Sequence, residues 1–463
     1  MSELSVLADF IVGLELRDVP EAARKAGVFH VLDTVGTAVG ATVDPQVISV
    51  TEEWMKKDSG GNTHIWGTGK TASVGTSLFL NAMMGHTQEM DDVHTNSKTH
   101  IGTVVVPAAW AVAEYLGASG ADFLLAVICG YETMSRVGMA FGVSAHRNRG
   151  WHVTATAGTF GAAAAVGKLL GLDREKMKNA LGLAGAQSFG TWAFLGDGAT
   201  SKTLNPARAA LSGAEAAFLA KAGMTGPEHI LTAEDGGLLS CMADGGDAGQ
   251  VKSGLGQKWQ ILEVDNKPYP TCRSTHCAID AAMELRRKYG MQAEEIDRVD
   301  VETYLVGYKQ CGVSEGSVHP ATAVHAKFST PFAVACAFLY GEVTLEQLKD
   351  EVVQEPQVQD LLKRVRVMVS DEFTSVYPAH WGCRVTVYKK DGSHWECCVK
   401  DASGSVDRPL TEMQVKEKAV SSMRGIIGGR TEEVAETILH IASCKKMPVL
   451  AGGIENGQIQ EEI

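Results

Sequence analysis

The chain has 463 residues, of which 45% are hydrophobic and 21% charged, and a formal net charge of −13 at pH 7. Single hydrophobic cores rarely serve more than roughly 250–300 residues, so two domains are expected, and the apolar content excludes a disordered chain. The negative charge argues against a general nucleic-acid binder, which needs a basic face to displace counterions from phosphates.

In the first half of the chain, apolar residues recur with helical periodicity. Gly117–Gly120 marks a turn between two helices, and Gly171 and Gly223 are typical positions for a helix to end. Asn205 and Pro206 are predicted as the N-cap and first residue of another helix. The predicted helices cover residues 20–40, 74–86, 104–117, 122–136, 153–171 and 206–222.

After about residue 265, apolar and polar residues alternate, which predicts strands near 299–303 and 365–369. Segments 384–390 and 394–399 flank Asp391-Gly392-Ser393 and predict a hairpin. Further helices are expected at 278–288, 329–340, 344–364 and 408–446, followed by a frayed tail at 452–463. We predict a mainly α protein with an α+β part between about residues 265 and 405.

A polar cluster, Glu89-Met90-Asp91-Asp92-Val93-His94, lies with His100 between two apolar helices. Its carboxylates and imidazoles are the groups that general acid–base catalysis uses. A solvated acidic loop with N-capping residues is the alternative interpretation, because Asp is common in both roles.

Two further candidates stand at predicted helix starts. His152 precedes the helix from residue 153, where the helix dipole favours a neutral imidazole that suits a base. Lys202 lies near the helix start at Asn205, where an ammonium group and the dipole together would hold a carboxylate. The alternatives are a capping or packed His and a surface Lys.

Lys267, Cys272, Arg273 and His276 follow one another at the boundary between the helical and α+β segments, in a stretch stiffened by two prolines. Clefts between domains are preferred ligand sites, so this stretch is a candidate for substrate binding. The alternative is a rigid linker whose basic residues face water.

Several chemistries are not supported by any motif. No GxGxxG follows a strand, and Walker and GxSxG motifs are missing. The ten cysteines form no CxxC pair and no zinc-spaced set, which predicts reduced thiols and no metal site. The N-terminus has no signal-peptide pattern, and the apolar stretch 101–116 is too short to span a bilayer. We therefore expect a cytoplasmic protein without a membrane or nucleic-acid partner.

Taken together, five stretches resemble the MmgE/PrpD family, which includes 2-methylcitrate dehydratases, cis-aconitate decarboxylases and an iminodisuccinate epimerase. They occur in the family's order, at residues 89–100, 150–171, 201–213, 267–280 and 326–329. The resemblance implies a large all-helical domain built from residues 1–265 and 405–463, with a smaller inserted α+β lid domain of residues 266–404. It also implies an active site between the two domains, a homodimer, and catalysis without a metal or organic cofactor.

The resemblance also carries site residues over to this chain by position. It implies a catalytic set that includes Glu89, where the decarboxylase branch has Asp, and a pair of substrate-binding lysines, Lys202 and Lys267. The other positions that it marks as catalytic are His100, His152, Cys272 and Tyr308.

The chain departs from the family pattern at several of these motifs. Val93 stands where Thr is frequent, Ile101 and Val153 replace a Pro, and Asn205 replaces a frequent His. Cys272 stands where the decarboxylase branch has His and the epimerase-like branch has Cys. These departures speak against a strict cis-aconitate decarboxylase.

We expect a cofactor-independent lyase of the dehydratase type that abstracts a proton α to a carboxylate of a small di- or tricarboxylate, such as a 2-methylcitrate-like acid. His100 or His152 is the expected base and the other the acid, with Glu89, Asp91 or Asp92 orienting an imidazole. Substrate carboxylates are expected on Lys202, Lys267, Arg273 and His276.

Two alternatives remain open. An epimerase or racemase of an amino- or iminodicarboxylate such as iminodisuccinate is favoured by Cys272, which would serve as a second base. The other alternative is a cis-aconitate decarboxylase-like activity, or a scaffold that has lost its chemistry.

Overall fold

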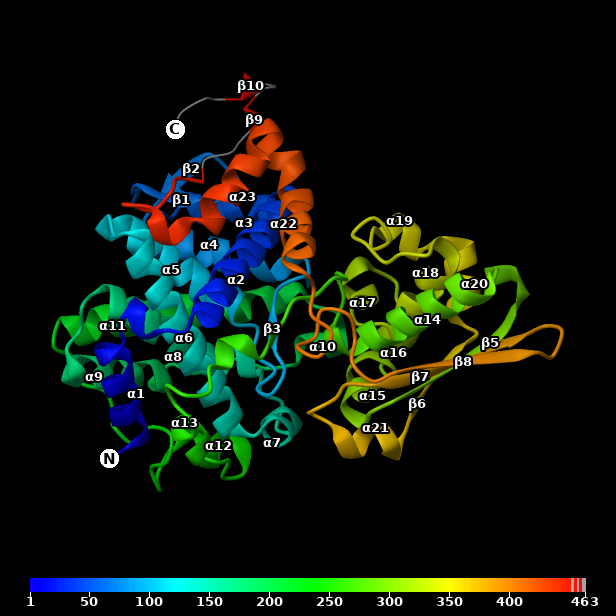
Figure 1. Cartoon of the computed structure of the whole chain (residues 1–463), viewed down its shortest axis with the longest axis horizontal. Coiled ribbons are helices and arrows are strands. Elements are labelled where there is room, and N and C mark those ends of the chain that lie inside the picture. The colour runs from blue at the N-terminus through cyan, green and yellow to red at the C-terminus, as the bar shows by residue number, and fades with distance from the viewer. Residues whose placement is uncertain (451–453, 456–457, 460–463) are drawn as a thin grey trace.

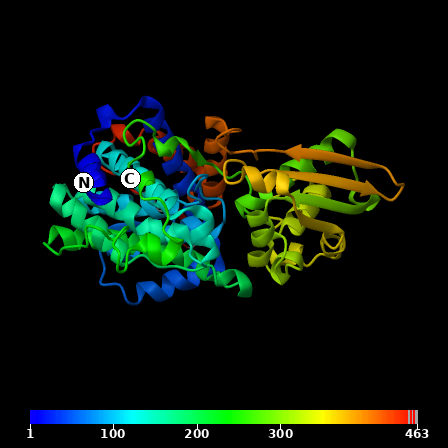
Figure 2. The ribbon, with the colours of Figure 1, turned by 90° about the horizontal axis from the view of Figure 1, so that it is seen from below.

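The computed structural model describes residues 1–450, 454–455 and 458–459, so the predicted fraying of the tail falls mostly outside the described residues. Helices account for 59% of the chain and strands for 9%, which confirms a mainly α fold with a minor α+β part. Figures 1 and 2 show the two parts side by side, with the first helices of the chain, in blue, and its last helices, in orange-red, in the helical part.

The helical part is organised around α8 (Val153–Leu169), whose residues 153–167 are all buried. α8 packs against α6 (Gly120–Phe141), α9 (Arg174–Ala186) and α11 (Leu204–Lys221). The other main helices of this part are α1 (Glu3–Gly13), α2 (Glu21–Gly40), α3 (Pro45–Met55), α4 (Val74–Thr87), α5 (Gly102–Leu116), α22 (Glu412–Ile427) and α23 (Thr431–Leu439). One hydrophobic cluster runs from Leu4 to Val264 and resumes from Ala419 to Leu450, because α22 and α23 pack back on α2.

Small residues let α8 and α11 approach closely. A Cβ added at Gly213 would lie 2.3 Å from the Thr159 carbonyl oxygen, and one at Gly158 would lie 2.9 Å from the Ala209 Cβ. Any larger side chain at these positions would push the helices apart. This packing places the first turn of α8, with His152 before it, beside the first turn of α11.

Two apolar helices are long enough to cross a membrane by length and composition, Glu21–Val43 and Gly120–Phe141. Both are longer than the 101–116 stretch that the sequence pattern singles out. Within their apolar windows, 78% and 89% of the residues are buried inside the molecule, as in the core helices of a globular part.

The α+β part contains a four-stranded sheet in the order β6-β5-β7-β8, parallel between β5 and β6 and antiparallel elsewhere. The strands are β5 (Ile296–Thr303), β6 (Val365–Val369), β7 (Cys383–Lys389) and β8 (His394–Val399), as predicted within a few residues. Val299, Val301, Val385 and Val387 are fully buried beneath α14 (His276–Tyr289) and α18 (Thr330–Tyr340).

The chain crosses between the two parts twice, and the crossings lie side by side. The Asn266 amide donates to the Gly404 carbonyl oxygen at 2.9 Å. Short strands β3 (Val93–His94) and β4 (Val264–Asp265) pair just before the first crossing. The second hydrophobic cluster spans residues 277–402, and the domain boundaries at 265/266 and 404/405 stay a prediction.

Two local predictions are wrong. The predicted helix 344–364 is two short helices, α19 (Asp350–Val353) and α20 (Pro356–Leu362), because the residue before Pro356 cannot easily stay helical. Asn205 is not an N-cap, because α11 begins at Leu204 directly after the 3-10 turn Thr200–Thr203. The Asn205 side chain instead reaches the His152 ring.

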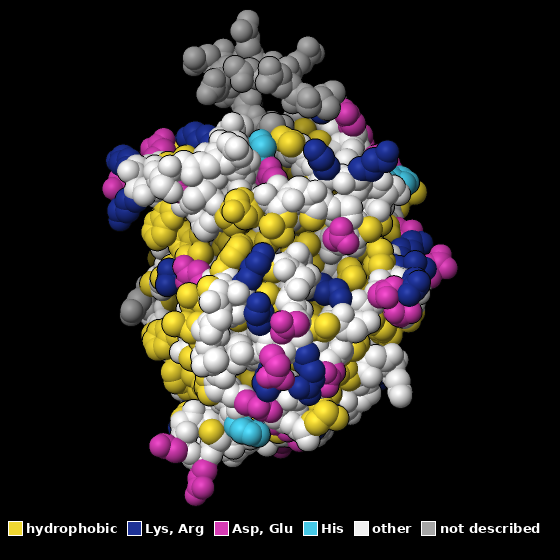
Figure 3. All heavy atoms as spheres, turned by 90° about the vertical axis from the view of Figure 1, so that its left-hand side faces the viewer, with side chains coloured by type: hydrophobic (Ala, Val, Ile, Leu, Met, Phe, Trp, Pro, Cys, Tyr) yellow, Lys and Arg dark blue, Asp and Glu magenta, His cyan; other side chains and the backbone are white. Residues whose placement is uncertain are grey.

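One face of the helical part, shown in Figure 3, mixes apolar side chains with scattered charged groups. Large apolar side chains with at least a third of their surface exposed are spread over several elements, among them Val43, Ile48, Leu219 and Met224. Their spread over several elements does not identify a subunit contact, so the homodimer stays a prediction.

Candidate active site

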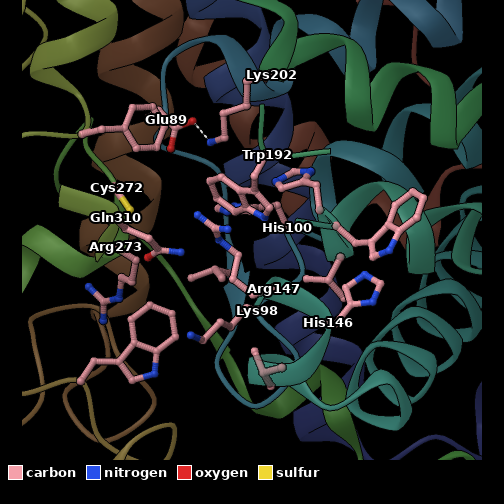
Figure 4. Close-up of a pocket in the computed structure, with 17 residues that line it drawn as sticks. Glu89, Lys98, His100, His146, Arg147, Trp192, Lys202, Cys272, Arg273 and Gln310 are labelled. Carbon is pink, nitrogen blue, oxygen red and sulfur yellow. Dashed lines mark hydrogen bonds and ion pairs between the residues drawn. The ribbon is translucent and has the colours of Figure 1, made fainter. Parts of the chain in front are cut away.

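A cavity lies where the two parts meet. Its wall on the helical side comes from the loop after α4, from α7 (Val143–Asn148), and from the starts of α8 and α11. The α+β part contributes the stretch after Lys267, α15 (Leu305–Cys311), Phe328 and Trp381. Figure 4 shows polar side chains from both walls pointing into this space.

Two lysines hold the buried carboxylate of Glu89 at the inner end of the cavity. Lys202 forms an ion pair with Glu89 Oε1, and Lys267 Nζ lies 3.3 Å from Oε2 and 2.9 Å from the Glu89 carbonyl oxygen. Glu89 adopts a left-handed backbone conformation with φ 57°, which is rare for a residue with a side chain and indicates that its surroundings hold it there. Burial raises the pKa of Glu89, but the two lysines outweigh burial and lower it below its ordinary value.

Asp91 links two imidazoles to the lysine pair. Its Oδ2 lies 2.6 Å from His86 Nδ1 and 3.1 Å from His100 Nδ1, and its Oδ1 lies 3.7 Å from Lys267 Nζ. Burial opposes ionisation of Asp91, but the imidazoles and Lys267 hold its pKa well below the usual range. Burial also lowers the pKa of His100, to about 4, so this imidazole is neutral at pH 7.

The orientation of His100 follows from its neighbours. Its Nδ1 also lies 2.9 Å from the Asp92 carbonyl oxygen, which can only accept a hydrogen bond. The neutral ring must therefore carry its proton on Nδ1, which leaves the lone pair on Nε2.

His152 has the opposite arrangement. Its Nδ1 lies 3.3 Å from Asn205 Nδ2, and that amide group also points at the Thr191 carbonyl oxygen, so Nδ2 is the donor. His152 therefore accepts at Nδ1 and carries its proton on Nε2. Its ring packs edge-on against Trp192, with centroids 4.8 Å apart. Burial and Lys202 lower the pKa of His152 well below its usual value.

Cys272 lies on the wall formed by the α+β part, across the cavity from His100 in Figure 4. A hydrogen bond with Cys311, the Ser274 amide and Lys202 lower the pKa of the Cys272 thiol to about 6 although burial raises it. Burial and the same contact raise the pKa of Cys311 well above its usual value. Cys272 is thus the acidic member of the thiol pair.

Three other predicted residues do not line the cavity. Asp92 accepts from the Gly102 amide at 2.8 Å and from the Tyr131 hydroxyl at 2.6 Å, beneath the start of α5. His276 is fully buried and bonded through both ring nitrogens, to Arg273 at 2.9 Å and to the Thr271 carbonyl oxygen at 3.2 Å. Tyr308 is half-buried and does not line the cavity.

Arg273 lines the cavity, but its donors are already used by protein acceptors. Its Nε donates to Asp265 at 3.0 Å, and its terminal nitrogens donate to the carbonyl oxygens of Ser403 and Ala402. Asp265 also accepts from the Thr95 hydroxyl and the Val406 amide. Arg273 thus joins the two chain crossings. This geometry indicates a structural role for Arg273, which the sequence predicted as a substrate ligand.

Several lining residues were not predicted from the sequence. They are His86, which belongs to the adjacent cavity as well as to the Asp91 cluster, and Lys98, His146, Arg147, Trp192, Gln310 and Trp381. Lys98 and Arg147 lie within or just before predicted motifs, so motif proximity was the only available signal. His146 is bonded at both nitrogens, to the Met242 carbonyl oxygen and the Thr156 hydroxyl.

His86, Asp91 and His100 present ligand atoms within 4.8 Å of one another, a donor set that suits a divalent metal ion. Lys267 Nζ lies 3.7 Å from the same Asp91 carboxylate and already supplies a positive charge there. A metal would have to compete with this ammonium group. The predicted absence of a metal stays a prediction.

Comparison with known proteins gives two adjacent family matches. The family described as MmgE/PrpD N-terminal domain matches residues 5–250, and the one described as MmgE/PrpD C-terminal domain matches residues 269–442. The chain is 26% identical to the cis-aconitate decarboxylase-like protein oryM of Aspergillus oryzae, over 94% of this chain and 93% of that protein. It is 27% identical to a cis-aconitate decarboxylase of Aspergillus terreus, over 90% and 87%, and 24% identical to a 2-methylcitrate dehydratase of Salmonella typhi, over 62% and 61%.

Proposed function

Because this chain belongs to the MmgE/PrpD family, we propose that it is a cofactor-independent lyase that transfers a proton at a carbon next to a carboxylate of a small di- or tricarboxylate. One observation carries the proposal. Two neutral imidazoles of opposite tautomer, His100 and His152, line the same cavity as the ammonium group of Lys202. A base and an acid are thereby set side by side before any substrate binds.

We assign the base to His100 and the acid to His152. His100 Nε2 takes the proton from the carbon, and Asp91 stabilises the imidazolium that forms. Lys202 lines the cavity and stabilises the negative charge that spreads onto the neighbouring carboxylate. Lys267, predicted from the sequence as a substrate ligand, is fully buried and instead holds Glu89 and Asp91 in place. In a dehydration, the electrons of the broken C–H bond form the double bond, and the hydroxyl leaves as water with the proton from His152 Nε2. The proton that His100 took then passes through water to His152, which restores both neutral rings.

Loss of carbon dioxide uses the same groups in another order. The carbon–carbon bond breaks first, its electrons pass into the conjugated acid as CO2 leaves, and His152 Nε2–H gives its proton to the carbanion. Water then returns a proton to the His152 ring. Within the lyase class, overall similarity favours decarboxylation of a cis-aconitate-like acid. The two Aspergillus relatives named above as cis-aconitate decarboxylase or decarboxylase-like match this chain along most of their length. Dehydration of a 2-methylcitrate-like acid is the other lyase reaction, and its named relative matches less of the chain.

Cys272 favours a second candidate, epimerisation of an amino- or iminodicarboxylate such as iminodisuccinate. A thiol with a lowered pKa lies across the cavity from His100, where it would return a proton to the opposite face of a planar carbanion. This candidate needs no leaving group, so it predicts exchange and inversion without a new product.

The test is to incubate the protein with cis-aconitate, 2-methylcitrate, citrate and iminodisuccinate in heavy water and to follow each by proton NMR. A new alkene or a decarboxylated product supports the lyase. Deuterium entering iminodisuccinate with inversion, without turnover of the other three, replaces the lyase by the epimerase. No change in any of the four acids contradicts both.

A further inference from the structure

Lys98 and Arg147 differ from the other cations of the cavity. Lys202 and Lys267 are paired with Glu89 and Asp91, and Arg273 is paired with Asp265. Neither Lys98 nor Arg147 forms an ion pair with a carboxylate anywhere in the described part of the chain. Arg147 Nε is in addition buried without a hydrogen-bond partner.

Aromatic rings hold both cations against the cavity wall. Lys98 Nζ lies 3.7 Å from the centroid of the Tyr377 ring and 5.0 Å from that of Trp381. The Arg147 guanidinium carbon lies 4.5 Å from the centroid of the Trp192 ring. Cation–π contacts orient such groups but do not neutralise their charge. Figure 4 shows the two side chains reaching into the cavity near each other, across from Gln310 and Arg273.

Gln310 adds a third donor at this end. Its Oε1 accepts from the Ser274 hydroxyl at 2.9 Å, which leaves the Nε2 amide protons without a protein acceptor in the described residues. Gln310 lines the cavity and is 7% exposed. An ammonium, a guanidinium and an amide N–H group therefore face one space.

The balance of charge points the same way. The inner cluster is neutral, since Lys202 and Lys267 match Glu89 and Asp91, whereas Lys98 and Arg147 have no carboxylate partner among the described residues. Burial lowers the pKa of Lys98 well below its usual range and lowers that of Arg147, and the nearby Cys272 thiol only partly opposes this shift. Buried cations without a counter-charge are costly, and a bound anion relieves that cost.

We infer that Lys98, Arg147 and Gln310 form a binding subsite for a substrate carboxylate remote from the carbon on which His100 acts. The inference rests on the proposed function for the identity of the anion as a substrate carboxylate. It restricts the substrate class to acids with at least two carboxylates, one near Lys202 and one at this subsite. A monocarboxylate would occupy one end of the cavity only.

The test is calorimetric binding of cis-aconitate, succinate and succinamate, the last of which replaces one carboxylate of succinate by an amide. Lys98→Met and Arg147→Met each remove one charge of the subsite. Lys57→Met and Arg149→Met are matched controls, since Lys57 lies over Trp54, Arg149 pairs with Asp244, and neither side chain lines the cavity. Each subsite variant is expected to weaken cis-aconitate and succinate binding about 10- to 100-fold, the usual effect of losing a charged hydrogen bond.

Succinamate provides the second readout. It is expected to bind wild-type protein more weakly than succinate, and this preference should vanish in the two subsite variants but persist in the controls. The subsite variants should also unfold at a temperature no lower than the wild type, because each loses an uncompensated charge.

Binding and turnover separate the two proposals. Kd values in Lys98→Met and Arg147→Met within twofold of those in the controls overturn the subsite, even if cis-aconitate is turned over. A preference for succinate that depends on Lys98 and Arg147 supports the subsite, even if none of the four acids reacts and the proposed lyase fails.

Discussion

At the scale of single residues, hydrogen bonds decide what each imidazole can do. His100 and His152 lie in one cavity and are both neutral at pH 7, but the groups at their Nδ1 atoms differ. A carbonyl oxygen fixes the proton of His100 on Nδ1, and an amide N–H group of Asn205 fixes that of His152 on Nε2. The sequence motifs mark both positions but cannot distinguish the two tautomers, because the bonded groups come from other segments.

The tautomers predict different losses in two variants. His100→Asn should lower the rate of solvent deuterium exchange into substrate, and of product formation, by about two to four orders of magnitude, because it removes the base. His152→Asn should lower product formation by a similar factor but keep deuterium exchange in the substrate. Proton NMR measures both rates, and His440→Asn, at an exposed position, is the control. Equal loss of exchange in the two active-site variants would contradict the assignment.

Asp92 is expected to affect stability rather than chemistry. Burial raises its pKa to about 7 although Tyr131 and Gly102 donate to it. Between about pH 4 and pH 7 the unfolded chain releases this proton and the folded protein retains it, so stability falls as the pH rises. His30 Nδ1 lies 3.9 Å from the carboxyl group, and the charge of the neighbouring Asp33 is matched by Lys418.

Asp92→Asn should remove this pH dependence. The difference in Tm between the variant and the wild type should become more positive from pH 4 to pH 8, since only the wild type has a buried carboxyl group to ionise there. Differential scanning calorimetry measures it. A difference that stays constant over this range would show that Asp92 does not titrate between the two states.

At the scale of elements, the close contact of α8 and α11 supports the site. Gly213→Ala should lower the free energy of unfolding by about 1–3 kcal/mol, because the new methyl group would overlap the Thr159 carbonyl oxygen and the Ala162 side chain. Denaturant unfolding measures the effect. Gly13→Ala is the matched control, since no atom lies within 4 Å of its added Cβ, and it should be neutral or stabilising.

Helices and strands with a long, regular pattern were predictable from the sequence, and irregular connections were not. The strands at 299–303 and 365–369 and the 384–399 hairpin repeat every second residue, and the structure has them within a few residues. The predicted helix 344–364 fails because Pro356 divides it. Asn205 fails as an N-cap because the 3-10 turn Thr200–Thr203 leads directly into α11, which begins at Leu204, two residues before the predicted start. The Asn205 amide is then free to contact His152.

At the scale of the whole molecule, the cavity depends on how the two parts are joined. Arg273→Met should lower the free energy of unfolding by about 3–5 kcal/mol, because it leaves the buried Asp265 carboxylate without its cation. Combining Asp265→Asn with Arg273→Met should recover part of the lost free energy of unfolding. Thermal unfolding of the single and double variants measures both. A higher KM with an unchanged Tm for Arg273→Met would instead support the role predicted from the sequence, in which Arg273 binds a substrate carboxylate.

The site could be predicted only in part from the sequence, because some of its residues gain their role from contacts between distant segments. Glu89, His100, His152, Lys202 and Cys272 belong to motifs, and the structure places all five around one cavity. Lys98, Arg147 and Gln310 follow no motif of their own. Their role depends on which cations find no carboxylate partner after folding, and that depends on contacts between segments more than a hundred residues apart.

The neighbouring chain crossings at Asn266 and Gly404 have a mechanical consequence. Because the α+β part is joined to the helical part by two neighbouring chain crossings, we expect it to slide or twist less easily than it rocks about those crossings. Reactant entry and product departure then share one axis of opening. A single engineered cross-link between the two parts, placed far from the crossings, should stop turnover while leaving every reacting group in position.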